Sequence, residues 1–212
     1  MTIITMATSK GGAGKTTIAE ILIGSLADRG HRVAAIDADL NRTLANWVEV
    51  FSNRPITVKA ETDETEIVPL ATGLEEHHDL VVIDTAGAAS RATVFAIGCS
   101  DLVLVPVQLS SSDVVEAIKT VKLVKSASEM TKREIPVYVV FTDYQPNTKI
   151  AAHTEGEVAK YGMPALATKV TRLVAFKEMT FTGEMPAGGA AGAIVDELLR
   201  ELSAIGALPF YK

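Results

Sequence analysis

One stretch of nine residues constrains the fold of this chain more than any other. Ser9–Thr17 reads Ser-Lys-Gly-Gly-Ala-Gly-Lys-Thr-Thr, and the short apolar run Ile3–Ala7 precedes it. After it, isoleucines and leucines recur at helical spacing as far as Gly30. A buried strand, a glycine-rich loop and a helix in this order are typical of a phosphate-binding loop. There, backbone N–H groups and the positive end of the helix face a polyphosphate.

The residue types inside this loop match that chemistry. The loop differs from the common G-x-x-x-x-G-K-[ST] pattern only at its first position, where Ser9 stands. Lys15 is predicted to bring its charge to the β and γ phosphates, and Thr16 to offer its hydroxyl to magnesium. A turn that only reverses the chain would need neither side chain. We therefore expect ATP and Mg²⁺ as cofactors, held by Gly11, Gly12, Ala13, Gly14, Lys15, Thr16 and Thr17.

Aspartates follow two further apolar runs. Asp37 and Asp39 end one run, and Asp84 ends the other, which reads Leu-Val-Val-Ile-Asp. The carboxyl ends of parallel strands meet at one edge of a sheet, where open α/β proteins place their ligands. We expect Asp84 and Asp37 to support the metal together with Thr16, and Asp39 to orient the attacking water.

Continuous β-branched runs alternate with helical patterns along the whole chain, which predicts an α/β domain with a doubly wound, mostly parallel sheet. A helix is expected from a capping-box-like start at Asp113 and Glu116 to about Met130, and Thr62–Glu66 is expected to be an acidic loop. Further strands are expected at Val33–Ile36, Pro55–Ala60, Leu80–Ile83, Leu102–Val107 and Val137–Phe141, and a last helix at Ala190–Ile205.

The overall composition narrows the class of protein. The chain has 212 residues, of which 48% are hydrophobic, and no shift in composition marks a boundary, so we expect one domain over residues 1–212. Cys99 is the only cysteine, which suits a reducing compartment. No apolar stretch approaches the roughly 20 residues that span a bilayer. We expect a cytoplasmic protein without stable membrane association.

These motifs together resemble a known family. Lys10-Gly-Gly-Ala-Gly-Lys-Thr-Thr, then Asp37-Ala-Asp39 and Asp84-Thr-Ala-Gly87, is similar to the deviant Walker A ATPases of the ParA/MinD superfamily, over essentially the whole chain. The length and the Asp37–Trp47 stretch look most similar to small plasmid-type ParA proteins, the ParF-like group. The related ATPase that assists T-DNA transfer shares this look.

The resemblance implies roles for particular residues. It makes Lys10 the signature lysine that reaches the phosphates of a partner subunit, Lys15 and Thr16 the contacts within the subunit, and Asp39 the group that orients the hydrolytic water. The adenine rim is expected at Pro106-Val-Gln108 and at the segment Thr168–Arg172.

The resemblance also implies partners. It predicts an ATPase of weak intrinsic activity that forms a homodimer on ATP, binds DNA without sequence preference, and is reset by a centromere-binding adaptor. Such a protein is nucleoid-associated when ATP is bound. DNA contacts are expected from Lys169, Arg172 and Lys177, with the basic stretch Lys119–Arg133 in reserve, because nonspecific binding needs clustered positive charge.

Other functions fit less well. An accessory ATPase of conjugative or T-DNA transfer remains an alternative, because the sequence does not separate it from a partition ATPase. A positioning regulator of the MinD type would need a basic amphipathic C-terminal helix, whereas the tail carries Asp196, Glu197 and Glu201. An iron protein of the nitrogenase type would need paired cysteines.

Overall fold

The computed structural model describes residues 2–87 and 90–211, and the strands in this part of the chain form one sheet. Every pair of adjacent strands is parallel. The predicted α/β fold with a parallel sheet is thus confirmed. In spatial order the strands are β3 (Thr57–Ala60), β2 (Val33–Ala38), β4 (Leu80–Thr85), β1 (Thr2–Met6), β5 (Leu102–Val107) and β6 (Val137–Phe141).

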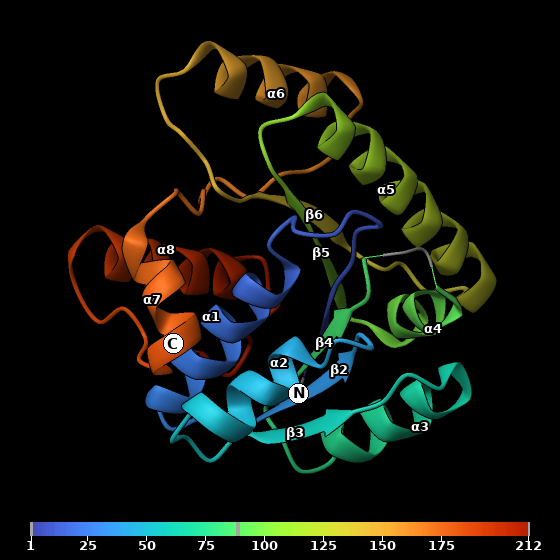
Figure 1. Cartoon of the computed structure of the whole chain (residues 1–212). Coiled ribbons are helices and arrows are strands. Elements are labelled where there is room, and N and C mark those ends of the chain that lie inside the picture. The colour runs from blue at the N-terminus through green and yellow to red at the C-terminus, as the bar shows by residue number, and fades with distance from the viewer. Residues whose placement is uncertain (1, 88–89, 212) are drawn as a thin grey trace.

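Helices cover both faces of the sheet, as Figure 1 shows. One face is covered by α1 (Lys15–Asp28), the short α2 (Thr43–Asn46), α7 (Val174–Thr182) and α8 (Gly189–Ala204). The other face is covered by α3 (Glu64–Glu75), α4 (Arg91–Cys99), α5 (Ser111–Thr131) and α6 (Lys149–Lys160). A π-helical turn, η1 (Trp47–Phe51), continues α2.

Side chains alternate between these two layers along each strand. In β1, Ile4 and Met6 belong to the core under α1 and α8, whereas Ile3 belongs to the core under α3 and α4. Both faces are buried, which explains why the strands read as continuous apolar runs. β1 lies between β4 and β5, at the point where the strand order reverses, and a ligand crevice is expected there at the carboxyl edge.

One predicted loop and one predicted helix start differ from the structure. The acidic segment Thr62–Glu66 is a loop only in part, because α3 begins at Glu64 and Asp63 caps it by accepting a hydrogen bond from the N–H of Thr65 (2.9 Å). Helix α5 begins at Ser111, before the expected start, because the hydroxyl of Ser110 accepts from the N–H of Asp113 (3.2 Å). Asp113 is therefore not a cap, and its carboxylate is available for a contact described below.

Candidate active site

The phosphate-binding loop joins β1 to α1 at the centre of the sheet edge. Gly12 (φ +76°) and Gly14 (φ +96°) adopt left-handed backbone conformations, which explains why glycine stands at both positions. Gly14 is also the residue before the first turn of α1. A side chain on Gly87 would meet the backbone of Gly11 at 3.0 Å, so the segment after β4 packs directly against the loop. The shape of this turn thus accounts for glycine at positions 12 and 14.

Two side chains from neighbouring strand ends brace the loop. Gln108, after β5, donates from Nε2 to the carbonyl of Gly12 (2.8 Å), and Thr142, after β6, donates from Oγ1 to the carbonyl of Ala13 (2.7 Å). With these carbonyls held outward, the N–H groups of the loop are left for an anion. The sequence prediction gave no role to Thr142 and named Gln108 only as part of the expected adenine rim Pro106–Gln108. Their position directly after predicted strands is the signal that marks them.

Lys15 and Thr16 lie where the loop enters α1. Lys15 is buried, and its Nζ donates to the carbonyl of Lys10 (3.2 Å), so the ammonium is folded back over the loop. Burial lowers the pKa of Lys15, while the charges of Asp84 and Asp39 partly offset this effect. A polyphosphate in the loop would supply the negative charge that this buried ammonium lacks.

Thr16 pairs with Asp84 across the same edge. The hydroxyl of Thr16 donates to Oδ2 of Asp84 (2.6 Å), and Oδ1 of Asp84 is buried with no hydrogen-bond partner in the described part of the chain. Burial raises the pKa of Asp84 to about 7, more than its hydrogen bond from Thr16 lowers it. A half-buried hydroxyl beside a buried carboxylate, one oxygen of which is unsatisfied, fits a Mg²⁺ ion, which prefers oxygen ligands. The predicted pairing of these two residues is present.

Asp37 and Asp39 follow β2 but differ in their surroundings. Asp37 is fully buried, and its two oxygens accept from the N–H groups of Ala45 (2.9 Å) and Asp39 (3.1 Å). Burial raises the pKa of Asp37, although these hydrogen bonds lower it. Asp39 is half-buried and accepts from the N–H (2.9 Å) and side-chain amide (3.0 Å) of Asn41. Asp37 thus braces the turn into α2, and Asp39 is the more accessible carboxylate.

Lys10 contacts the first turn of α5 in the same chain. Its Nζ lies 2.6 Å from Oδ2 of Asp113 and 3.1 Å from the hydroxyl of Ser112. The side chain of Asp113 is almost fully buried, whereas that of Lys10 is 35% exposed. The side chain of Lys10 therefore points toward α5 at the mouth of the loop, whereas the side chain of Lys15 lies over the loop itself.

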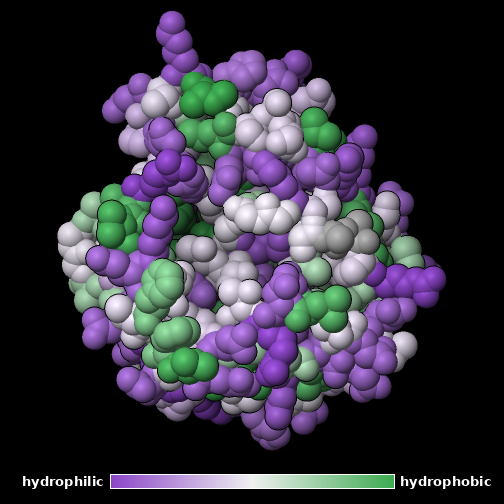
Figure 2. Space-filling view, viewed as in Figure 1, coloured by the Kyte–Doolittle hydropathy of each residue, from purple (hydrophilic) through white to green (hydrophobic). Residues whose placement is uncertain are grey.

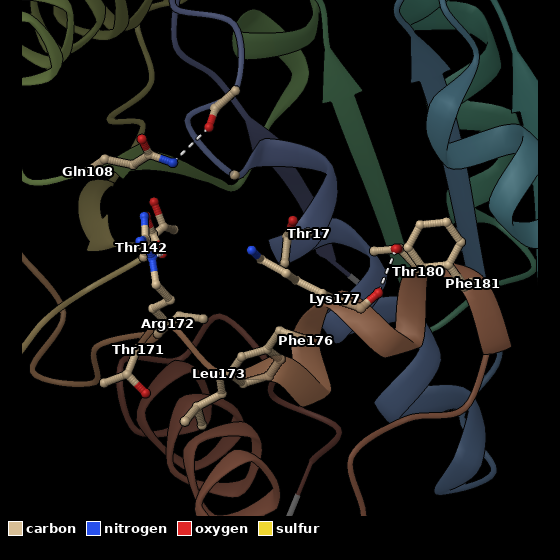
Figure 3. A pocket seen from close by; sticks show the side chains of 14 residues that line it. Thr17, Gln108, Thr142, Thr171, Arg172, Leu173, Phe176, Lys177, Thr180 and Phe181 are labelled. Atoms are coloured by element: carbon tan, nitrogen blue, oxygen red, sulfur yellow. Dashed lines mark hydrogen bonds and ion pairs between the residues drawn. The ribbon is translucent and has the colours of Figure 1, made fainter.

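A central pocket of about 360 Å³ opens beside the loop. Seen from the side of Figure 1, this face of the molecule is hollowed near its centre (Figure 2). Figure 3 shows Arg172 and Thr142 on one side of the pocket, with Phe176 and Lys177 of α7 on the other. The guanidinium of Arg172 forms a two-pronged ion pair with Asp143, and its Nε lies 2.5 Å from Oδ1. This pair holds the pKa of Asp143 below its ordinary value.

The predicted adenine rim is placed differently at its two ends. Arg172 lines the central pocket, as expected. Pro106 lies inside β5, where it is buried and paired with Val140, and it is not among the residues that line the pocket. Gln108, the last residue of the same predicted segment, does line the pocket, because side chains beyond the strand end reach the sheet edge.

The three basic residues predicted to contact DNA do not form one free surface. Lys169 is paired with Glu155 and lies over the ring of Tyr144 (4.8 Å from its nitrogen to the ring centroid). Lys177, like Arg172, lines the central pocket, and Figure 3 shows its side chain extending into the cavity. In the reserve stretch, Lys122 and Lys125 are exposed on α5.

Two kinds of site are absent from residues 2–87 and 90–211. These residues contain no group of three or more histidine, cysteine, aspartate or glutamate side chains placed to hold a metal ion by themselves. Nor do they contain a helix that is both long enough and apolar enough to cross a membrane.

Comparisons with known proteins identify the family and the fold of this chain. The family model described as VirC1 protein matches residues 1–185. A protein named ParA from Rhizobium radiobacter is 34% identical over 157 residues, which cover 73% of this chain and 70% of that protein. The fold is similar to that of the cell division ATPase MinD from Pyrococcus furiosus, with a TM-score of 0.76, 18% identity, and coverage of 96% of this chain and 99% of that one. It is also similar to that of cobyrinic acid a,c-diamide synthase from Mycobacterium smegmatis, solved with an ATP analogue and magnesium, with a TM-score of 0.74, 20% identity and 96% coverage of both chains.

Proposed function

We propose that this chain, which belongs to the VirC1 family within the ParA/MinD superfamily of ATPases, binds and hydrolyses ATP as a nucleotide-dependent switch on DNA. The observation that carries the proposal is the pairing of Thr16 with Asp84, whose second oxygen is buried and unsatisfied beside the phosphate-binding loop. These two side chains could together provide oxygen ligands for a metal ion that accompanies a polyphosphate.

Different residues at the site would bind the phosphates, the metal ion and the attacking water. Backbone N–H groups of Gly11–Thr16 would cradle the phosphates, and Lys15 would place its ammonium on their oxygens. Thr16 and Asp84 would hold Mg²⁺, which neutralises charge on the β and γ phosphates when it is bound. Asp37 would support this edge through the turn that it braces, and Asp39 would orient the attacking water.

Binding of the base is proposed for the far end of the central pocket. Arg172 offers a planar guanidinium that Asp143 orients, and Phe176 supplies apolar surface on the other side. A purine base can stack on both kinds of surface. Fluorescence anisotropy with a labelled ATP analogue, with and without Mg²⁺, tests the assignment, and the absence of nucleotide binding to the parent protein would refute it.

ATP-dependent dimerisation is the next part of the proposal. Lys10 is the residue that the family resemblance assigns to the phosphates of a partner subunit, and its contact with Asp113 leaves it partly exposed at the mouth of the site. Light scattering with ATP, ADP and no nucleotide tests this step. Lys10→Ala should remain monomeric with ATP and still bind it, since Lys15 is intact.

We propose that DNA binds to the ATP-bound dimer. A two-fold dimer doubles each basic cluster on one assembly, and doubled phosphate contacts raise both the affinity and the salt dependence, by about 0.9 log units per contact for each tenfold change in salt. We propose Lys169, Arg172 and Lys177 as the contacts, with Lys119–Arg133 in reserve. Binding of a centromere-type adaptor would reset the dimer by stimulating hydrolysis.

The structure sharpens the DNA experiment. Replacing Arg172 or Lys177 would also alter the central pocket, so Lys169→Glu is the cleaner test of the first cluster and Lys122→Glu with Lys125→Glu tests the reserve. One of these changes should weaken the retardation of DNA in gel shifts with ATP, while light scattering still reports a dimer. Equal retardation with ATP, ADP and no nucleotide would show that nucleotide does not control DNA binding.

A second candidate is an accessory ATPase of conjugative or T-DNA transfer. The match to the VirC1 family model favours it, and its chemistry at this site is the same. Deletion of the coding gene separates the two candidates: loss of inherited plasmid indicates partition, and loss of transfer with normal inheritance indicates the accessory role.

A further inference from the structure

A second pocket adjoins the ATP site, and apart from Thr16 and Thr17, which line it on that side, the function proposed above gives no role to its interior. This side pocket has a volume of about 410 Å³ and opens between α1, the α2–η1 segment and α7. It shares Thr17 and Thr180 with the central pocket. Its size is above what one ion needs and within the range of small-molecule sites, roughly 300–1,000 Å³.

Glu20 is the only ionisable residue that lines the side pocket. It lies on α1, one turn after Thr16, and is only 2% exposed. Its Oε2 is buried without a hydrogen-bond partner among the described residues. Buried carboxyl groups in folded proteins are nearly always paired, so an unpaired one that lines a cavity points to a missing partner.

The rest of the wall suits a cation that carries several N–H donors. Thr16 and Thr43 supply hydroxyl oxygens, and Asn41 and Asn46 supply amide oxygens. Trp47 and Phe51 supply the aromatic part of the wall, and aromatic rings stabilise organic cations. No described lysine, arginine or histidine lines the pocket, so positive charge must come from outside it.

We propose that the side pocket binds an alkylammonium or guanidinium group, which forms a charge-assisted hydrogen bond with Glu20. Burial and the nearby charge of Asp84 raise the pKa of Glu20 to about 8 in the empty pocket, as expected for a carboxyl group that lacks a cation. Asn41, which lines the pocket, donates to Asp39 (3.0 Å). An occupant would therefore lie one side chain away from the candidate water-orienting carboxylate.

The experiment uses Trp47, the only tryptophan in the chain, as a local reporter. The protein without nucleotide is titrated with N-acetylarginine amide and, in a second arm, with putrescine, at constant ionic strength, and fluorescence and calorimetry are followed. N-acetylcitrulline amide serves as the neutral control of similar shape. Because nucleotide is absent, the result does not depend on whether the protein is an ATPase.

The proposal expects saturable binding of a cationic probe and none of the citrulline probe. Response to the arginine amide alone would identify a protein side chain as the natural occupant, and response to putrescine alone would identify a free amine. Glu20→Gln should weaken binding by tenfold or more, on the order of one charge-assisted hydrogen bond. Asn46→Asp, at an exposed position of the wall, should strengthen it and guards against a folding defect in the first variant.

Three results would overturn the proposal. One is equal binding of the citrulline and arginine probes, which would show that charge is irrelevant. Another is unchanged affinity in Glu20→Gln. The third is the lack of a specific response to organic cations. No response to either cation would leave the pocket to water, and an equal response to potassium chloride alone would leave it to an inorganic ion.

Discussion

Replacement of Asp37 by alanine should destabilise the protein even when nucleotide and Mg²⁺ are absent. The sequence places Asp37 among the metal-supporting residues, but in the structure its two oxygens accept the N–H groups of Ala45 and Asp39 inside the protein. These bonds hold the turn between β2 and α2. A residue whose main task were to support a metal would show its effect only with the metal present.

The magnitude follows from these two bonds. Each buried N–H group left unpaired costs about 1–3 kcal/mol, so the loss of both gives about 2–6 kcal/mol. Burial of the carboxylate raises the pKa of Asp37 and costs free energy. Asp37→Ala removes this cost, which partly offsets the loss of the two hydrogen bonds. Such a group stabilises the fold fully below its ordinary pKa and loses that contribution as the pH rises through its folded-state pKa. At neutral pH we therefore expect a net loss of about 2–3 kcal/mol, or roughly 4–12 °C in Tm.

Urea denaturation followed by Trp47 fluorescence, without nucleotide or Mg²⁺, measures this loss. Asp37→Asn should fall between the parent and the alanine variant, because an amide keeps one acceptor oxygen. Asp39→Ala is the matched control, since Asp39 accepts only from Asn41 at the surface and its loss should leave the midpoint unchanged. If Asp37→Ala unfolds at the parental midpoint, the bracing role assigned to Asp37 is wrong.

Three further substitutions test the site. Lys15→Ala should lower ATP affinity by roughly tenfold or more, because a charged contact with the phosphates is lost; unchanged affinity by calorimetry would contradict its role. Asp39→Ala should keep ATP and the dimer but lose turnover, and phosphate release at the parental rate would refute the water-orienting role. Glu20→Gln should gain in Tm relative to the parent between about pH 5 and pH 9, because stability from protonated Glu20 is lost as the pH rises through its pKa of about 8. A constant difference in Tm over that range would show that Glu20 does not titrate as the structure implies.

The sheet was largely predictable from the sequence, for a simple physical reason. Strands β5 and β6 coincide with the predicted runs Leu102–Val107 and Val137–Phe141, because strands covered on both faces need unbroken apolar sequence. Helix α3 was missed in part because its first turn is acidic and exposed, and Pro69 lies within it. An acidic first turn favours a helix, since it faces the positive end of the helix dipole.

Site residues were predictable from the sequence where they lie in one short motif, and were not predictable where their role depends on contacts that form only in the folded chain. Lys15 and Thr16 lie in one short motif, and the pairing of Thr16 with Asp84 follows from the meeting of parallel strand ends. The bracing by Thr142 depends on a carbonyl 129 residues away in the chain. Glu20 looks like any polar helix residue until tertiary packing buries it.

The position of β1 in the sheet has a consequence for how the protein is synthesised. Both neighbours of β1 come from much later in the chain, with Ile4 opposite Val82 on one side and Leu102 on the other. The phosphate loop is therefore translated before both of its flanking strands and gains the second of them only after β5 has left the ribosome. Pairings of such large sequence separation form slowly and leave apolar strands exposed meanwhile. The loop can therefore take the shape that holds a nucleotide only after these late pairings have formed.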